Sequence, residues 1–462
     1  MKIIIVGGGK VGKTILESLL REKHEIVVID NDPSVVGQVT NTYDVMGVCA
    51  NGTDYEKLIE AGADKADLFI AVTGLDELNM LSCFAAKKIG ARHTVARIRN
   101  SEYNTSSWDF MKKQLEISMA INPEKLAAEA VYNILKLPSA TKVETFTARS
   151  FEMIEIAVRK GSLLDGISLM ELRKKCPEKF LVCVLLRGKE VFIPNGNFVV
   201  KEGDKIGVMA TNNDAHRLLR LFGFSQKEAK NILIIGASKV SLYLTEMLLK
   251  GHNTVKIIEK DPEKCEEICE KLSSKVTVVE GDGMSREILL EEGVENVDAL
   301  LACTNRDEEN ILISFYALSK KVSKVIAKVN RNELSLISEN LGLETTFSPK
   351  NVVADTLVRY ARAISNSEGS KVETLYSLFG GNAEALEFVV TSDFKYTDVP
   401  LKRLQTKDNV LIAGITRQGQ AMIPGGDDFI KCGDNVIVIA KGERRKALQP
   451  LGYSKTLTTG EL

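Results

Sequence analysis

Three glycines near the start of the chain have the types and spacing to hold a phosphate group. Gly7, Gly9 and Gly12 form the pattern G-x-G-x-x-G directly after the apolar run 3–6. Gly7 allows a sharp turn, Gly9 lets the backbone approach a phosphate, and Gly12 lets a helix pack closely on a strand. The start of such a helix offers unpaired N–H groups and the positive end of its dipole to phosphate oxygens. The sequence therefore predicts a nucleotide site at this loop.

An acidic residue ends the second apolar run. Asp30 follows the residues IVVI, and a carboxylate at that place accepts hydrogen bonds from ribose hydroxyls. Because it would repel a 2′-phosphate, it favours NAD-like ligands. A glycine pattern alone is a weak signal, but here it opens a β-α-β unit that also carries this acid. The alternative is a tight turn in a fold without a ligand.

Further candidates stand where later strands are expected to end. Asn51 follows the third strand, near the adenine, and Thr73 follows the fourth, at the switch in strand order. Arg97 ends the fifth strand, where it reaches either a phosphate or a surface carboxylate, and both interpretations stay open. We expect Asp76 to cap the next helix. The complete set of predicted cofactor-binding residues is Gly7, Gly8, Gly9, Lys10, Val11, Gly12, Asp30, Asn51, Gly52, Thr73, Gly74 and Arg97.

The chain also contains a second copy of this pattern. Residues 232–241 read ILIIGASKVS, so that Ser238 and Ser241 stand where the first copy has glycine. Glu259 corresponds to Asp30. A register held over many positions is typical of an internal duplication. Since serine side chains occupy space at the phosphate, we expect weak or altered binding there, or a purely structural role. Other matching pairs are Thr73 with Thr304, Asp76 with Asp307, Asn79 with Asn310, Arg97 with Lys328, and Gly203-Asp204 with Gly433-Asp434.

Apolar strand patterns and helical patterns alternate in both copies. Near-continuous apolar strands predict two doubly wound, Rossmann-like parallel sheets that are covered on both faces. Shorter strands after each sheet predict a small α+β domain. In the first copy we expect strands near 2–6, 25–30, 44–48, 67–72, 93–97 and 116–121, and helices near 10–22, 33–41, 53–61, 76–89, 101–113 and 123–136. The predicted domains are 1–136, 143–211, 231–362 and 372–453.

Composition excludes several classes of protein. The 61 basic and 62 acidic residues give a net charge of -1, which argues against a dedicated nucleic-acid binder. The eight cysteines form no C-x-x-C pair, and we expect thiols in a reducing cytosol rather than a metal site. No apolar stretch approaches the roughly 20 residues of a membrane-spanning helix. The chain opens directly on a strand pattern, so we expect a soluble protein without a signal peptide.

Candidate catalytic groups are few. The pairs Tyr132 with Lys136 and Tyr316 with Lys320 have the Y-x-x-x-K spacing that transfers protons in short-chain dehydrogenases. That family spaces its glycine loop differently, and we interpret both pairs as neighbours on a helix face. None of the four histidines resembles a catalytic base. We therefore expect no enzyme. An NAD-dependent oxidoreductase is the alternative, and a scaffold with a vestigial site is a third.

The motifs IIIVGGGKVG, VVID, ANGTD, AVTGLDELNM and VARIR resemble the TrkA family, the cytosolic regulatory subunits of Trk-type potassium uptake systems. The tandem RCK order, a nucleotide-binding domain and a TrkA C-terminal domain given twice, covers essentially the whole chain. The resemblance implies NAD(H) or ATP/ADP as a regulatory ligand at Gly7, Gly9, Gly12 and Asp30. Ala50-Asn51 departs from the Gly-Asp that the family often has.

The resemblance also implies partners and a place in the cell. Members of the family assemble, usually as tetramers, beneath a TrkH-type membrane subunit that transports potassium, and they pass the effect of the ligand to the pore. The resemblance thus implies a cytoplasmic homo-oligomer, peripheral on the inner face of the cell membrane through its partner. It implies no nucleic-acid partner.

Overall fold

A computed structural model of the chain describes residues 1–22, 24–100, 103, 106–137, 140–146, 151–223, 229–272, 275–367, 372–379, 382–392, 394, 396–404 and 409–441. They form two compact units. Unit 1 combines Met1–Tyr132, here the first lobe, with Asn231–Ala361, here the second lobe. Unit 2 combines Asn133–Lys230 with Arg362–Leu462. The domain limits expected from the sequence remain a prediction, and the last of them, 442–453, fall outside the described residues.

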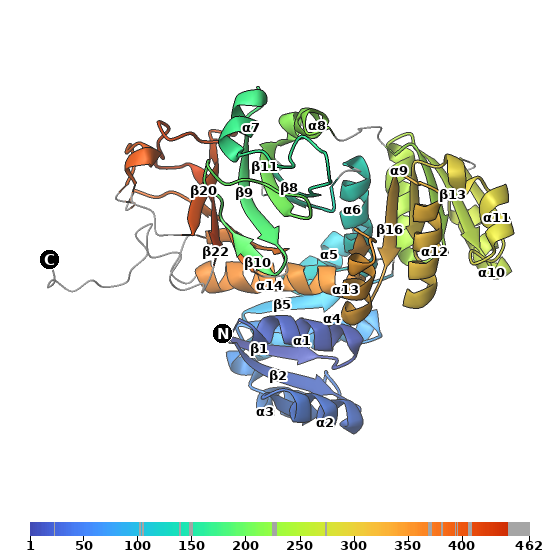
Figure 1. The fold of residues 1–462 in the computed structure, drawn as a ribbon. Coiled ribbons are helices and arrows are strands. Elements are labelled where there is room, and N and C mark those ends of the chain that lie inside the picture. Colours follow the sequence, from blue (N-terminus) through green and yellow to red (C-terminus); the bar gives the residue numbers. More distant parts are fainter. Residues whose placement is uncertain are drawn as a thin grey trace, which may run out of the picture. The chain divides into compact units, whose positions relative to one another are not determined.

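The first lobe, in blue and cyan in Figure 1, is built on a parallel sheet. Its six strands have the order β3-β2-β1-β4-β5-β6. Its strands are β1 (Lys2–Val6), β2 (Glu25–Asp30), β3 (Met46–Cys49), β4 (Leu68–Ala71), β5 (His93–Arg97) and β6 (Met119–Ile121). Its helices are α1 (Lys10–Leu20), α2 (Pro33–Thr42), α3 (Tyr55–Glu60), α4 (Asp76–Ile89), α5 (Ser106–Gln114) and α6 (Pro123–Lys136). The predicted alternation is confirmed, with β3 and β6 beginning two and three residues later than expected.

Both faces of this sheet are covered. Ile3, Ile4 and Ile5 follow one another in β1, so their side chains point to opposite faces, and all three are fully buried. This is the burial expected of a parallel sheet with helices on both sides. The strand order reverses between β1 and β4, and ligands enter folds of this kind at such a switch point.

The second lobe repeats the same topology. Its sheet has the order β14-β13-β12-β15-β16-β17, which is the first order with every strand replaced by its counterpart. Its strands are β12 (Asn231–Ile235), β13 (Thr254–Glu259), β14 (Val276–Glu280), β15 (Ala299–Ala302), β16 (Lys324–Lys328) and β17 (Thr346–Phe347). Its helices are α9 (Lys239–Lys250), α10 (Pro262–Lys271), α11 (Arg286–Glu291), α12 (Asp307–Ser319), α13 (Asn332–Asn340) and α14 (Pro349–Ser367). The duplication predicted from the sequence is therefore a duplication of the fold.

Unit 2 contains two five-stranded antiparallel sheets, ordered β10-β9-β11-β8-β7 and β18-β19-β22-β20-β21. The first has β7 (Lys142–Thr145), β8 (Phe151–Ala157), β9 (Phe180–Arg187), β10 (Glu190–Phe192) and β11 (Lys205–Thr211), with helices α7 (Leu169–Lys175) and α8 (Asn212–Leu221). The second has β18 (Val372–Leu378), β19 (Ala383–Val389), β20 (Val410–Arg417), β21 (Gln420–Met422) and β22 (Asn435–Lys441). The predicted α+β character is confirmed, and β7 is a strand that the sequence pattern did not indicate.

The two small sheets share one apolar core. Phe151 and Met153 of β8 are buried in the same cluster as Tyr376 of β18 and Ile437 of β22. The rings of Phe146 and Tyr376 lie 4.4 Å apart between centroids. Burial of this apolar surface stabilises the pairing of the two sheets within unit 2.

An arginine–aspartate pair explains one repeated dipeptide. The carboxylate of Asp204, which is 1% exposed, accepts two hydrogen bonds from Arg187, at 2.8 and 2.7 Å. Asp434 and Arg417 form the same pair in the second small sheet, at 2.9 and 2.8 Å. Bidentate pairs of this kind hold two segments in a fixed geometry. Gly203-Asp204 and Gly433-Asp434 therefore recur because each aspartate fixes the turn before a core strand.

One buried carboxyl group in unit 2 makes the stability depend on pH. Glu155 lies in β8 on the same alternating face as Phe151 and Met153, and its Oε1 has no hydrogen-bond partner among the described residues. Burial raises the pKa of Glu155, because the charged form loses its hydration. The folded state therefore holds this proton more tightly than the unfolded state.

We expect Glu155→Gln to stabilise the protein in neutral and alkaline solution. Lys142 and Lys205 lower the pKa of Glu155, Glu144 raises it, and the N–H of Phe379 lowers it, but burial is the largest effect. Stability contributed by the protonated form is present at acid pH and is lost as the pH rises through the folded pKa. The melting temperature of the variant should exceed that of the wild type at about pH 8 and equal it at about pH 4.5. An equal difference at both pH values would contradict this.

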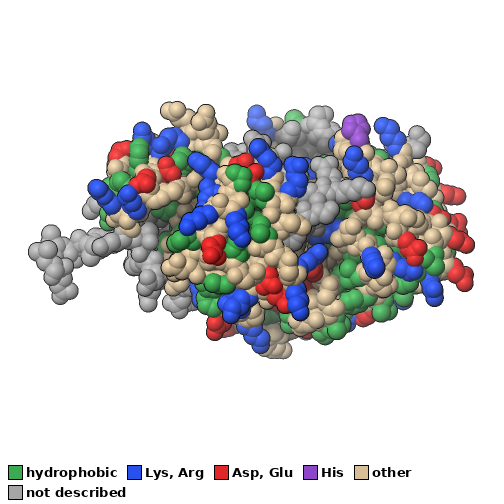
Figure 2. Space-filling view, turned by 45° about the horizontal axis from the view of Figure 1, so that its top comes forward, with side chains coloured by type: hydrophobic (Ala, Val, Ile, Leu, Met, Phe, Trp, Pro, Cys, Tyr) green, Lys and Arg blue, Asp and Glu red, His purple; other side chains and the backbone are tan. Residues whose placement is uncertain are grey.

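The surface carries mixed charges. Figure 2 shows Lys and Arg side chains interspersed with Asp and Glu over the visible face, in keeping with the net charge of -1. Within the described ranges, no helix has both the length and the hydropathy of a membrane span.

Candidate functional site

The glycine loop of the first lobe has the shape that its sequence predicts. Gly7 follows β1 with φ at +101°, and a Cβ there would lie 3.0 Å from the backbone nitrogen of Thr73. A Cβ on Gly12 would collide with the carbonyl oxygen of Gly7, so only glycine lets α1 approach the end of β1 this closely. A Cβ on Gly9 would meet no atom within 4 Å, which leaves this side of the loop open.

Helix α1 begins without a side-chain cap. Gly9 is its N-cap residue, and no side chain of the described residues accepts a hydrogen bond from the N–H groups of its first turn. The first N–H groups of a helix have no partner within the helix. They therefore face the open side of the loop with their hydrogen-bonding capacity free for an anion.

Asp30 closes the loop from the neighbouring strand. Its Oδ2 accepts a hydrogen bond from the N–H of Gly8 at 2.6 Å, and its Oδ1 accepts one from the N–H of Asp32 at 3.0 Å. A carboxylate has about four lone-pair sites, so capacity remains for ribose hydroxyls. Asp30 thus holds the glycine loop in place as well as facing the cavity beside it.

A cavity of about 520 Å³ lies at the carboxyl end of the first sheet. Ten of the twelve predicted cofactor-binding residues line it: Gly7, Gly9, Lys10, Val11, Asp30, Asn51, Gly52, Thr73, Gly74 and Arg97. Gly8 and Gly12 do not line it, because they face Asp30 and the carbonyl oxygen of Gly7. Asn31, Leu75 and Leu78 line it without having been predicted. Their positions in the sequence, directly after β2 and at the start of α4, could have indicated them.

A buried amide joins the strand ends at the cavity. The Oδ1 of Asn79 accepts hydrogen bonds from the N–H and the hydroxyl of Thr73, at 2.8 and 2.7 Å, and its Nδ2 donates to the carbonyl of Arg97 at 2.9 Å. Asn310 repeats the two backbone bonds, to the N–H of Thr304 and the carbonyl of Lys328. Sequence reasoning noted this repeat without finding its role, which is to hold the ends of two strands together.

Arg97 lies against the cavity rather than in a surface ion pair. Its Nη1 donates to the carbonyls of Val72 and Thr73 at 3.5 and 3.3 Å, and its buried Nε has no partner among the described residues. Burial lowers the pKa of Arg97. Arg97 lines the cavity, and its contact with a phosphate stays a prediction.

The prediction that Asp76 caps its own helix is wrong. Leu75 is the N-cap residue of α4, and no side chain caps it. Asp76 instead accepts hydrogen bonds from the N–H groups of Arg99 and Asn100 at 2.8 and 2.7 Å. These backbone groups follow β5 and would otherwise lack partners, which makes them stronger competitors for the carboxylate.

The second lobe differs at its helix start. Ser238 is the N-cap of α9, and its hydroxyl accepts from the N–H of Ser241 while the hydroxyl of Ser241 accepts from the N–H of Ser238. Ser241 also donates to the carbonyl of Gly236 at 2.6 Å. This is a capping box, in which side chains of the chain itself satisfy the helix start. The cavity beside it is about 160 Å³.

The two tyrosine–lysine pairs do not reach these cavities. Tyr132 and Tyr316 line neither the cavity of the first lobe nor that of the second. The ammonium of Lys320 lies 5.8 Å from the ring centre of Tyr316, in keeping with neighbours on one helix face. No group of three or more metal-binding side chains occurs within the described part of the chain.

Comparison with known proteins agrees with this arrangement. The profile of the TrkA-N domain matches residues 3–123 and 232–349, and that of the TrkA-C domain matches residues 153–223. The Trk system potassium uptake protein TrkA homolog of Archaeoglobus fulgidus is 31% identical over 98% of this chain and 100% of its own length. The TrkA protein of Halomonas elongata is 28% identical over 96% and 97%.

A solved structure shows the same fold. The GsuK channel bound to NAD is similar to this chain with a TM-score of 0.62 and 15% identity, over 97% of this chain and 78% of that one. The GsuK RCK domain matches with a TM-score of 0.62 over 98% and 95%. Both TrkA-N matches cover the glycine loops described above, and the curated relatives match over nearly their full length. The chain therefore belongs to the TrkA family of Trk-system potassium uptake proteins.

Proposed function

We propose that this chain is a nucleotide-sensing regulatory subunit of a Trk-type potassium transporter, and that its first lobe binds the nucleotide. The contrast between the two helix starts carries the proposal. Helix α1 begins at Gly9 without a cap, beside a cavity of about 520 Å³, whereas Ser238 and Ser241 cap α9 beside about 160 Å³. The oxygens of a phosphate would accept hydrogen bonds from the first N–H groups of α1, as the serine hydroxyls do at the start of α9.

The ligand we propose is NAD(H) or ATP/ADP. Its phosphates would take the N–H groups at the start of α1, and its ribose would bind Asp30. Asn51 and Gly52 would lie near the adenine, and Lys10 and Arg97 would add positive charge. GsuK is bound to NAD in one solved structure and to ADP in another, which supports this class of ligand. The second lobe would bind nucleotide weakly, or act only as structure.

The regulatory part of the proposal concerns the partner. A ligand shifts a conformational equilibrium only if it binds two states unequally. We propose that the chain forms a homo-tetramer on the inner face of the cell membrane. Binding of the nucleotide would change the conformation of a TrkH-type subunit, and the nucleotide would not be chemically altered. The names of the relatives as potassium uptake proteins support this partner.

Binding of NAD, NADH, ATP and ADP to the purified full-length chain tests the ligand. We expect at least one of them to raise the unfolding free energy, by about 2.7 kcal/mol at a hundredfold excess over Kd. Absorbance at the NADH band should stay constant. Steady oxidation of NADH with a small-molecule acceptor would favour an oxidoreductase, and no binding to the intact oligomer would favour a scaffold.

A further inference from the structure

A third cavity in unit 1, of about 920 Å³, is strongly basic. Nine basic and four acidic side chains line it, and both lobes contribute. The acidic side chains are already engaged: Glu124 pairs with Arg99, for example, and Glu308 with Arg331. Asp307 accepts from backbone N–H groups at the end of β16. Lys264 and Arg306 pair with Asp261 and Glu309 outside the lining. The basic lining residues without an ion pair to the described residues are Lys10, Arg97, Lys239, Lys328 and Lys350.

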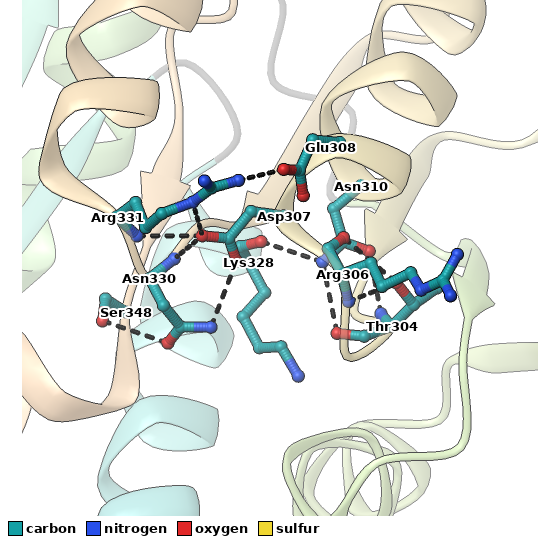
Figure 3. Close-up of polar contacts among 9 residues, drawn as sticks. All are labelled: Thr304, Arg306, Asp307, Glu308, Asn310, Lys328, Asn330, Arg331 and Ser348. Carbon is teal, nitrogen blue, oxygen red and sulfur yellow. Dashed lines mark hydrogen bonds and ion pairs between the residues drawn. The ribbon is translucent and has the colours of Figure 1, made fainter. Parts of the chain in front are cut away.

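Lys328 is the most informative of these basic residues. It ends β16 at the place that Arg97 holds in the first lobe, and it is 7% exposed. Its carbonyl accepts from Asn310, but within the described residues its ammonium has no hydrogen bond and no ion pair. Figure 3 shows the ammonium extending away from the neighbouring polar network. The stem of the side chain is buried, and the ammonium, which has no partner in the described part of the chain, reaches the open space of the cavity.

The surrounding network explains why Lys328 has no partner. Asp307 belongs to this network, and its carboxylate accepts hydrogen bonds from the N–H groups of Asn330 and Arg331 at 2.9 Å each (Figure 3). Glu308 pairs with Arg331 on the far side of that loop. The carboxylates therefore hold the loop after β16 and leave the ammonium toward the cavity.

Two more lysines surround the same space. Lys239 is the first residue of α9, and Lys350 lies in the first turn of α14. Neither forms an ion pair with a carboxylate of the described residues, although Lys239 is close enough to Glu267 to help lower the pKa of that carboxyl group, after the larger effect of Lys271. Lys10 and Arg97 line both this cavity and the glycine-loop cavity of the first lobe, so the two spaces are neighbours.

We propose that this cleft binds a phosphoryl anion, with the unpaired ammonium of Lys328 as its counter-charge. The phosphoryl group comes either from a free polyphosphate or from the terminal phosphate of a nucleotide whose adenosine lies in the first lobe. Both sources present the same tetrahedral oxygens to the same cations. The site does not require the regulatory function proposed above.

The test uses inorganic tripolyphosphate and the full-length protein. Calorimetry should show that tripolyphosphate binds the wild type and that Lys328→Gln weakens this binding at least about tenfold. Lys328→Arg keeps the charge, as in the first lobe, and should retain most of the affinity. The affinity should fall with added salt, because cations and phosphate are screened. Lys320→Gln removes a lysine of the same lobe outside the cleft and should change nothing.

Competition separates the two sources. One outcome is that ADP does not weaken the binding of tripolyphosphate and that Lys328→Gln does not change the affinity for ATP. The anion is then free polyphosphate. The other outcome is that ATP displaces tripolyphosphate and that Lys328→Gln weakens the binding of ATP but not of ADP. The phosphoryl group is then the terminal phosphate of the nucleotide. Equal tripolyphosphate binding by wild type and Lys328→Gln, or none by the wild type, would overturn the proposal. If tripolyphosphate binding depends on Lys328 but no nucleotide binds the protein, only the proposed nucleotide-sensing function is contradicted.

Discussion

Gly12→Ala is expected to remove nucleotide binding and to destabilise the first lobe. The new methyl group would collide with the carbonyl oxygen of Gly7 and lie 3.0 Å from its carbonyl carbon. Neither atom belongs to a flexible side chain, so α1 must move away from β1. Overpacking of this kind costs about 1–3 kcal/mol. Displacing the start of α1 also moves the N–H groups that we expect to hold phosphate. Thermal unfolding with and without NAD or ADP measures both effects.

Gly37→Ala is the matched control. Gly37 lies inside α2, and an added Cβ there meets no atom within 4 Å. Alanine is the better helix former by roughly 1 kcal/mol, so this variant should be slightly more stable with unchanged affinity. Gly12→Ser should fall between wild type and alanine in stability, because Ser241 bonds the equivalent carbonyl in the second lobe. Wild-type affinity in Gly12→Ala would refute the proposed role of the loop.

Asp30→Ala is expected to weaken nucleotide binding about a hundredfold, which is roughly 2.7 kcal/mol. The carboxylate accepts from the N–H groups of Gly8 and Asp32, and we propose that it also accepts from the ribose. Hydrogen bonds to a charged group contribute about 1.5–3 kcal/mol each, so the variant loses a ligand contact together with the loop clamp. Titration calorimetry with NAD measures the loss.

The second lobe supplies the control for this prediction. Glu259 accepts from the N–H of Ala237 at 2.6 Å and from that of Asp261 at 3.0 Å, as Asp30 does in the first lobe. Glu259→Ala should therefore destabilise its own lobe to a similar extent while leaving NAD affinity unchanged. If both variants lose a similar amount of NAD affinity, then removing the carboxylate that holds the loop in either lobe disturbs the whole of unit 1. Unchanged affinity in Asp30→Ala would remove this carboxylate from the ligand site.

Periodicity and glycine spacing were enough to predict the sheets. The strands of the first lobe read as unbroken apolar runs because both faces are buried, and helical patterns separate them. The glycine roles followed from the same reasoning, since a turn and a close helix approach each admit only one residue type. The duplicated order of elements then extended these predictions to the second lobe.

Side-chain partners could not be predicted in the same way. The sequence shows Asp76 at the start of a helix, which favours a cap, but the backbone after β5 brings two N–H groups to it from 23 and 24 residues away. Asn79 joins Thr73 to Arg97 only once β4 and β5 lie side by side. Such long-range competition has no local signal. The basic cleft around Lys328 likewise exists only because separate strand ends and helix starts meet.

The serine pair at the start of α9 has a consequence for a cell that runs short of metabolites. Ser238 and Ser241 are covalently part of the helix they complete, so their hydroxyls cannot be diluted away. Under the proposed function, the glycine helix of the other copy takes the same bonds from a dissolved nucleotide. Starvation would then loosen one half of a duplicated molecule and leave its twin unaltered, so that the second copy would serve as an internal reference for the first.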